Sequence, residues 1–166
     1  MLLVRYCRRW HTLVDNRLQH GGSLALHWGS VRIVKQLTGH ANTVRSCAFA
    51  PEGSTLVTVS YDHTVRMWAT AGDWSHLRTL TEHTNYVSSC AFAPDGGTLV
   101  TVSIVHTVRV WATGDWSHLH TLTGHTHFLV SCAFAPDGGT LVTVSRDNTA
   151  CVWATEDHYV RHLLVV

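Results

Sequence analysis

The sequence predicts an all-β protein, a partial β-propeller of three four-stranded antiparallel blades plus an N-terminal partial blade, with a ring that does not close within the chain. The stretch from Thr79 to Thr113 returns at 121–155 with most residues unchanged, and again, less closely, at 36–70. A period of 42 or 43 residues is typical of propellers and solenoids. Within each copy, short runs rich in Val and Thr are separated by Pro-Asp-Gly-Gly or Pro-Glu-Gly-Ser, which favours strands and turns over helices.

Length and composition are those of a globular chain, with 166 residues, 45% of them hydrophobic and 14% charged. The formal net charge of +1 gives no sign of the basic face that a nucleic-acid partner would require. No apolar run approaches the length of a membrane span, and the start is too short for a signal peptide. We therefore expect no nucleic acid, no membrane and a cytoplasmic location, with the nucleus as the alternative.

In chain order, residues 1–20 are irregular and 21–35 form a degenerate partial blade, followed by repeats at 36–78, 79–120 and 121–166. In the first repeat we expect strands at 44–50, 55–60, 64–69 and 76–80. Pro51 and Gly53 suit the first turn, because proline presets a negative φ and glycine accepts a positive one. A ring of about four to eight blades closes a propeller, so three repeats leave two apolar faces open.

Three features recur together in every repeat: Gly-His or Glu-His near the start, Ala-Phe-Ala-Pro at the first turn, and Trp at the end of the third strand. With the pattern S-x-D-x-T-V-R-x-W, this sequence resembles the WD-repeat β-propeller family from Gln36 onward. The dipeptide that names the family is Trp-Ala here, at Trp68, Trp111 and Trp153.

The resemblance implies a structural hydrogen-bond chain of histidine, hydroxyl, aspartate and tryptophan in each blade. We assign it to His40, Ser60, Asp62 and Trp68, to His83, Ser103 and Trp111, and to His125, Ser145, Asp147 and Trp153. Thr58 and Thr143 share strand faces with Ser60 and Ser145, so they are alternative hydroxyls. The middle repeat has Val105 in place of the aspartate and Glu82 in place of glycine. We expect His83 to be less firmly held, at a cost of about 1 to 3 kcal/mol unless another acceptor substitutes.

Other chemistry is less well supported by the pattern. The same groups could be taken for a Ser-His-Asp triad, but a triad depends on geometry and need not be built three times. Cys47, Cys90 and Cys132 recur once per repeat, which indicates buried packing and reduced thiols. A histidine cluster at His118, His120, His125 and His127 has no completing carboxylate. We predict no enzyme, no cofactor and no metal.

The repeats differ in the loops that, in this family, line the face where partners commonly dock. We predict that these loop positions bind a protein or peptide partner: Thr43, Arg45, Tyr61, Tyr86, Ile104, Phe128 and Arg146. Tyr86, Ile104 and Phe128 would form an apolar patch bordered by the two arginines; alternatively, Tyr86 and Phe128 only cover the adjacent blade.

The overall prediction is a non-enzymatic scaffold for protein–protein interaction that is part of a larger propeller protein. The alternatives are a protomer of a homodimeric ring of about seven blades, and a metal-binding or enzymatic propeller that uses the histidine-rich loops. Self-association through the open blade ends is a further expectation.

Overall fold

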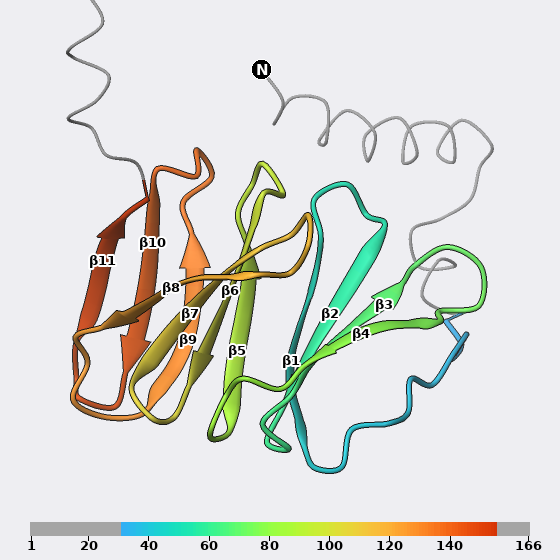
Figure 1. Cartoon of the computed structure of the whole chain (residues 1–166), viewed down its shortest axis with the longest axis horizontal. Coiled ribbons are helices and arrows are strands. Elements are labelled where there is room, and N and C mark those ends of the chain that lie inside the picture. Colours follow the sequence, from blue (N-terminus) through green and yellow to red (C-terminus); the bar gives the residue numbers. More distant parts are fainter. Residues whose placement is uncertain (1–30, 156–166) are drawn as a thin grey trace, which may run out of the picture. The chain divides into compact units, whose positions relative to one another are not determined.

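The computed structural model describes residues 31–155, which form three antiparallel sheets (Figure 1). Blade 1 consists of β1 (Val44–Phe49), β2 (Thr55–Ser60), β3 (Val65–Ala69) and β4 (His76–Leu80). Blade 2 consists of β5 (Val87–Phe92), β6 (Thr98–Ser103), β7 (Thr107–Ala112) and β8 (His118–Thr123). Blade 3 consists of β9 (Leu129–Phe134), β10 (Thr140–Ser145) and β11 (Ala150–Ala154).

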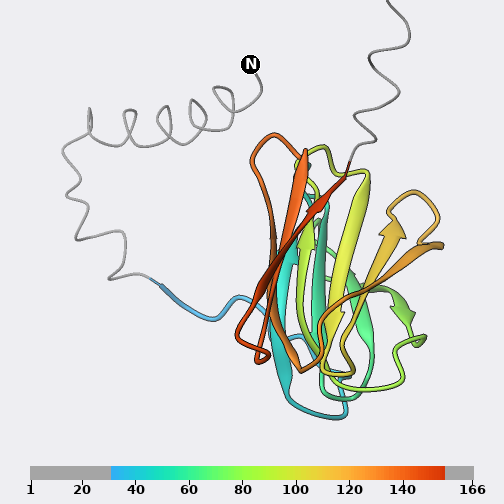
Figure 2. The same ribbon diagram turned by 90° about the vertical axis from the view of Figure 1, so that its left-hand side faces the viewer.

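Each sheet follows the order of its strands in the chain, so every connection within a blade is a hairpin. The blades stand next to one another, and their first strands β1, β5 and β9 are neighbours. In the described part of the chain, blade 2 is covered on both sides, whereas blades 1 and 3 each have one neighbour (Figures 1 and 2). The ring is therefore open.

Tight turns join the first two strands of each blade. Gly53, Gly96 and Gly138 occupy equivalent places there with φ of 77° or 78°, a conformation that glycine adopts without a Cβ penalty. In blade 1 the Gly53 N–H donates to the Ala50 carbonyl at 2.8 Å. The expected positive φ at Gly53 is confirmed.

The hydrophobic core lies between the blades, because strands of Val, Leu and Trp present apolar side chains on both faces. One cluster joins blade 1 to blade 2 through Val57, Val59, Val65, Met67 and Leu80 on one side and Val87, Cys90, Leu99 and Trp111 on the other. The second joins blade 2 to blade 3 through Val100, Val102 and Val108 against Leu129, Cys132 and Leu141. The two interfaces are thus built from equivalent positions of the repeat.

The all-β, open propeller fold predicted from the sequence is confirmed, and the strands of the first repeat lie within one residue of the expected bounds. Blade 3 shows three strands among the described residues, and the rest of the third repeat, 156–166, lies outside them. The predicted irregular segment 1–20 and most of the partial blade 21–35 also lie outside. Residues 31–35 form no strand. No helix in the described part of the chain is long and apolar enough to cross a membrane.

Candidate functional site

A four-membered hydrogen-bond chain runs through blade 1. The Trp68 indole N–H donates to Thr58 Oγ1 at 2.9 Å, and Thr58 Oγ1 lies 2.8 Å from His40 Nε2. On the other side of the ring, His40 Nδ1 lies 2.8 Å from Asp62 Oδ2. A carboxylate only accepts, so Nδ1 carries the proton, and in the neutral ring Nε2 accepts from the threonine hydroxyl. The chain therefore runs in one direction from Trp68 to Asp62.

Asp62 receives several donors besides the histidine. Its Oδ2 accepts the Ala41 N–H at 2.9 Å, and its Oδ1 accepts the Thr64 N–H at 2.9 Å and hydroxyl at 2.6 Å. Burial acts to raise the pKa of Asp62, but the bonds from Thr64, Ala41 and His40 outweigh it and hold that pKa well below its usual range. One carboxylate thus ties the loop before β1 to the turn after β2.

Blade 3 repeats this arrangement. His125 Nδ1 lies 2.7 Å from Asp147 Oδ2, its Nε2 lies 2.9 Å from Thr143 Oγ1, and the Trp153 N–H donates to the same threonine at 2.9 Å. The Thr149 hydroxyl, with His125 and the Thr126 N–H, holds the pKa of Asp147 well below its usual range despite partial burial.

The hydroxyl in these chains is a threonine, so the assignment of Ser60, Ser103 and Ser145 is wrong. Ser60 lies at the end of β2, where its hydroxyl donates to the Asn42 carbonyl at 3.1 Å and accepts the Asp62 N–H at 3.0 Å. Ser145 makes the equivalent bond to the His127 carbonyl, and the Ser103 hydroxyl donates to the Tyr86 carbonyl, one residue further along the loop. The serines close the turn, while Thr58, Thr101 and Thr143, two residues earlier on the same strand face, reach the ring.

The middle blade retains only half of the hydrogen-bond chain, the part that contains the threonine and the tryptophan. His83 Nε2 lies 2.7 Å from Thr101 Oγ1, which accepts the Trp111 N–H at 2.8 Å. His83 Nδ1 is buried with no hydrogen-bond partner among residues 31–155, because Val105 stands where the other blades have aspartate. Glu82 does not substitute: its carboxylate lies 3.4 Å from Arg109 Nη1. The expected loss of the carboxylate partner in this blade is therefore seen in the contacts.

The setting of His83 disfavours its charged form. Burial, followed by the nearby positive charge of Arg109 and by His118 and His63, lowers the pKa of His83 to about 3. An unpaired buried nitrogen costs about 1 to 3 kcal/mol of folding free energy. His83 is accordingly a neutral, incompletely satisfied core residue.

None of these groups is arranged for nucleophilic chemistry. Thr58 is only 8% exposed, and Thr101 and Thr143 are fully buried. Each threonine oxygen already holds a tryptophan N–H, so it is neither accessible nor free to attack a substrate. The geometry is that of polar contacts within a core.

Histidine and cysteine side chains do not gather elsewhere either. Within residues 31–155, no group of three His, Cys, Asp or Glu is placed to hold a metal ion. His118 bonds the Thr121 hydroxyl at 2.9 Å, and His125 belongs to its blade's chain. Burial raises the pKa of the Cys90 thiol well above its usual range and that of Cys132 to about 12. The expectation of a buried Cys47 is wrong: it is exposed on the free face of blade 1.

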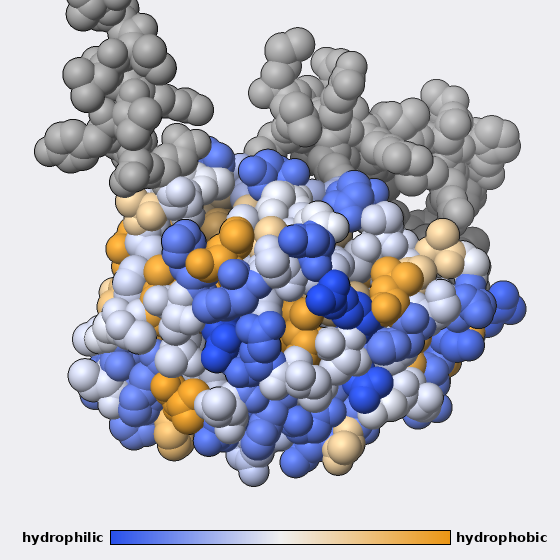
Figure 3. Space-filling model, in the orientation of Figure 1, coloured by the Kyte–Doolittle hydropathy of each residue, from blue (hydrophilic) through white to orange (hydrophobic). Residues whose placement is uncertain are grey.

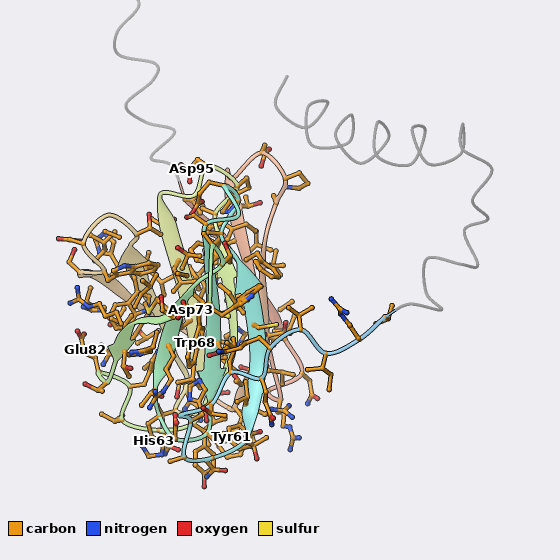
Figure 4. The ribbon with its side chains drawn as sticks, turned by 90° about the vertical axis from the view of Figure 1, so that its right-hand side faces the viewer. Tyr61, His63, Trp68, Asp73, Glu82 and Asp95 are labelled. Carbon is orange, nitrogen blue, oxygen red and sulfur yellow. The ribbon has the colours of Figure 1, made fainter. Side chains whose placement is uncertain are left out.

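The predicted partner-binding residues, here called the rim, lie at one end of the blades. They pair by backbone hydrogen bonds: the Tyr61, Ile104 and Arg146 N–H groups donate to the Thr43, Tyr86 and Phe128 carbonyls at 3.0, 3.1 and 2.9 Å. Each blade therefore joins one residue before its first strand to one residue after its second. Figure 4 shows Tyr61 and His63 at this end and Asp95 at the opposite end.

Aromatic contacts cross from blade to blade along the rim. Tyr61 of blade 1 stacks on Tyr86 of blade 2, with ring centroids 4.5 Å apart and planes at 22°, and Arg45 lies over Tyr61 at 5.3 Å. Phe128 of blade 3 lies 6.3 Å from His106 of blade 2. The side chains thus form two aromatic groups at the two blade junctions, rather than one patch centred on Ile104. Tyr86 and Phe128 remain 38% and 40% exposed, so they both cover a neighbour and face outward.

Two sets of residues were missed by the sequence reasoning. The first is Thr64 and Thr149, whose hydroxyls bind the aspartates; a threonine two residues after each turn position was the available signal. The second is His63 and His106, which contact Tyr86 and Phe128 and adopt positive φ of 70° and 65°. No sequence pattern marked these two histidines as rim residues.

Comparisons with known proteins agree with this geometry. The profile described as "WD domain, G-beta repeat" matches residues 31–69, 74–112 and 116–154. A 37-residue stretch is 46% identical to U3 small nucleolar RNA-associated protein 21 of Saccharomyces cerevisiae, covering 22% of this chain and 4% of that protein.

Among solved structures, "Structure of U3-55K" and "Crystal structure of RRP9 WD40 repeats" each superpose with a TM-score of 0.69 at 22% identity. Each match covers 72% of this chain but only 38% and 37% of the respective structures, so the chain spans well under half of the length of these relatives. At this identity the likeness concerns the fold alone. The three profile matches take in more than half of the residues, and the chain belongs to the WD40 repeat family.

Proposed function

We propose that this chain is a non-enzymatic WD-repeat scaffold whose rim binds a protein or peptide partner. The observation that carries the proposal is the pair of exposed aromatic residues, Tyr86 and Phe128, at equivalent loop positions on neighbouring blades. Large aromatic side chains that are already ordered by a neighbour lose little entropy on binding, and tyrosine and arginine are enriched among residues that dominate binding energy.

The rim combines such anchors with positive charge. Arg45 lies over the Tyr61 ring, and Arg45 and Arg146 are both exposed. A guanidinium can bind a carboxylate through two parallel hydrogen bonds. We therefore infer a partner segment that carries apolar side chains next to acidic ones.

Support for a scaffold also comes from what the polar groups do. In blades 1 and 3 the histidine chains satisfy buried polar atoms and support rigid strands beneath the rim. Loops held on a rigid framework commonly carry binding function. A cytoplasmic location, with the nucleus as the alternative, remains part of this proposal.

The test is a capture experiment that compares the wild type with the double variant Tyr86→Ala and Phe128→Ala. The matched control is Leu119→Ala on β8, because Leu119 is 44% exposed but lies on the outer strand of blade 2, away from the rim. We expect the rim variant to lose a partner that the control retains, with both variants unfolding at the wild-type temperature. Equal capture by all three proteins would show that the rim is not the binding surface.

The yeast relative is named for a small nucleolar RNA, but its match to this chain is one repeat long. Nuclease treatment before capture separates direct protein binding from tethering through RNA. Our proposal requires that capture survive this treatment.

A further inference from the structure

Among residues 31–155, the two end faces of the blade stack have no partner, and they are copies of the surfaces that pair between the blades. On blade 3, four valines face outward: Val130, Val142, Val144 and Val152, called here the valine face. The counterparts of Val142, Val144 and Val152 in blade 1 are Val57, Val59 and Met67, which are fully buried against blade 2. In blade 3, Val130, Val144 and Val152 are instead 45%, 38% and 68% exposed.

The free face of blade 1, at the opposite end of the stack, carries the surface that is complementary to the valine face. On β1 of blade 1, Val44 and Phe49 are 50% and 57% exposed and Cys47 is exposed; these three form the phenylalanine face. Their counterparts in blade 2, Val87 and Cys90, are buried against blade 1, and Phe92 packs against the same cluster. In blade 3 the counterparts Leu129 and Cys132 are buried against blade 2.

We propose that a second copy of this chain docks head to tail, with the valine face of each copy on the phenylalanine face of the other. The occupant is indicated by the interfaces inside the chain: twice, a surface built like the valine face pairs with a surface built like the phenylalanine face. Figure 2 looks onto the blade 3 end, and Figure 4 looks onto the blade 1 end.

The residues at the docking positions favour contact. Arg45 in blade 1 and Ser88 in blade 2 correspond to Val130 in blade 3, so the free end is more apolar at this position. Hydrophobic atoms are visible in Figure 3 at the edge of the molecule where Figure 1 places β10 and β11. Burying such valines stabilises association, because apolar area leaves water.

Two copies joined at both ends contain six described blades, within the range of about four to eight that closed propellers use. The contact is between different surfaces, so it closes into a ring only if the rotation between blades allows, and otherwise extends into a filament. We infer the closed pair, since it leaves neither apolar face exposed.

The experiment measures mass by sedimentation over a range of concentrations for the whole chain. We expect a dimer that dissociates on dilution, and Val152→Asp or Phe49→Asp should each weaken it at least about tenfold, because a carboxylate would be buried against apolar side chains. Leu119→Asp is the control, since Leu119 is exposed on a blade whose two faces are already covered. It should leave the dimer unchanged.

Mixing the two aspartate variants tests the head-to-tail geometry. Each variant alone should dimerise at least about tenfold more weakly than the wild type. The mixture should form a tighter hetero-pair, because the intact phenylalanine face of Val152→Asp meets the intact valine face of Phe49→Asp. A variant that dimerises alone as tightly as the wild type would indicate pairing of like faces and overturn the proposal. So would a wild type that stays monomeric, forms open filaments, or is held only by another protein. Circular dichroism of each variant confirms that it is folded.

Discussion

His83 differs from His40 and His125 in the surroundings of a single atom. Its Nε2 has the same threonine partner, but its Nδ1 faces no acceptor. In the outer blades that nitrogen donates to a carboxylate whose other bonds come from backbone N–H groups and a threonine hydroxyl. The difference lies in one residue, Val105, and can be reversed by one substitution.

We expect Val105→Asp to stabilise the protein by about 1 to 2 kcal/mol, because it supplies a charged acceptor for His83 Nδ1 and for nearby N–H groups. Urea unfolding followed by circular dichroism measures the change. The converse variant, Asp147→Val, should remove the carboxylate partner of His125 Nδ1, as in the middle blade, and should destabilise the protein. A Val105→Asp protein no more stable than the wild type would show that the orphaned nitrogen carries no cost.

The lowered pKa of His83 makes stability depend on pH. Its pKa is about 3 in the folded protein against 6.5 ordinarily, so the unfolded chain binds more protons between these values. The contribution of His83 to the free energy of unfolding is fully present above about pH 6.5. It is lost as the pH falls toward 3, by up to about 1.4 kcal/mol per pH unit. The lowered pKa values of Asp62 and Asp147 act at more acid pH, below about 4.

We therefore expect His83→Gln to flatten the decline of unfolding free energy between pH 6.5 and 4.5, whatever its effect at neutral pH. Titrations of urea unfolding at several pH values compare the slopes of the two proteins. Parallel slopes would mean that other groups set the acid sensitivity.

At the scale of elements, the turns between second and third strands are unequally held. In blades 1 and 3 the aspartate N–H donates to a serine hydroxyl at 3.0 and 3.1 Å, and the aspartate accepts the N–H of Thr64 or Thr149 at 2.9 Å. In blade 2 the Val105 N–H reaches Ser103 Oγ only at 3.5 Å, and valine offers no acceptor. The β6–β7 turn is the weakest of the three.

Amide hydrogen exchange resolves this difference. We expect the Thr107 amide to exchange faster than those of Thr64 and Thr149, because protection follows the stability of local hydrogen bonds. Val105→Asp should slow exchange at Thr107 and leave the outer turns unchanged. Equal rates at the three threonines in the wild type would contradict this account.

Strands and turns were predictable because they depend on local chemistry. Glycine at positive φ, proline at the turn and runs of valine and threonine mark β1 to β3 without knowledge of the neighbours. The choice between Thr58 and Ser60 was not predictable, because both lie on one face of β2 and only the depth of the histidine ring decides between them. The contacts of His63 and His106 depend on how far adjacent blades rotate, which no single repeat encodes.

For the whole molecule, the period predicted the architecture and the repeated positions predicted the interfaces between blades. Cys47 shows the limit of that reasoning. It occupies the same place as Cys90 and Cys132, yet it is exposed, because within residues 31–155 no blade packs on that side of blade 1. Burial in a repeat protein is a property of the pair of blades, so equivalence in sequence predicts it only for residues between two repeats.

The missing carboxylate in the middle blade also has a mechanical consequence. In blades 1 and 3 a continuous series of hydrogen bonds connects the rim loops to the tryptophan of the third strand, so displacing a loop strains the blade beneath it. In blade 2 the series of hydrogen bonds ends at His83. The loops around Tyr86 and Ile104 are therefore more easily deformed than the corresponding loops of blades 1 and 3. If a partner binds the rim as we propose, it would reshape the centre of the rim while the strands below keep their positions.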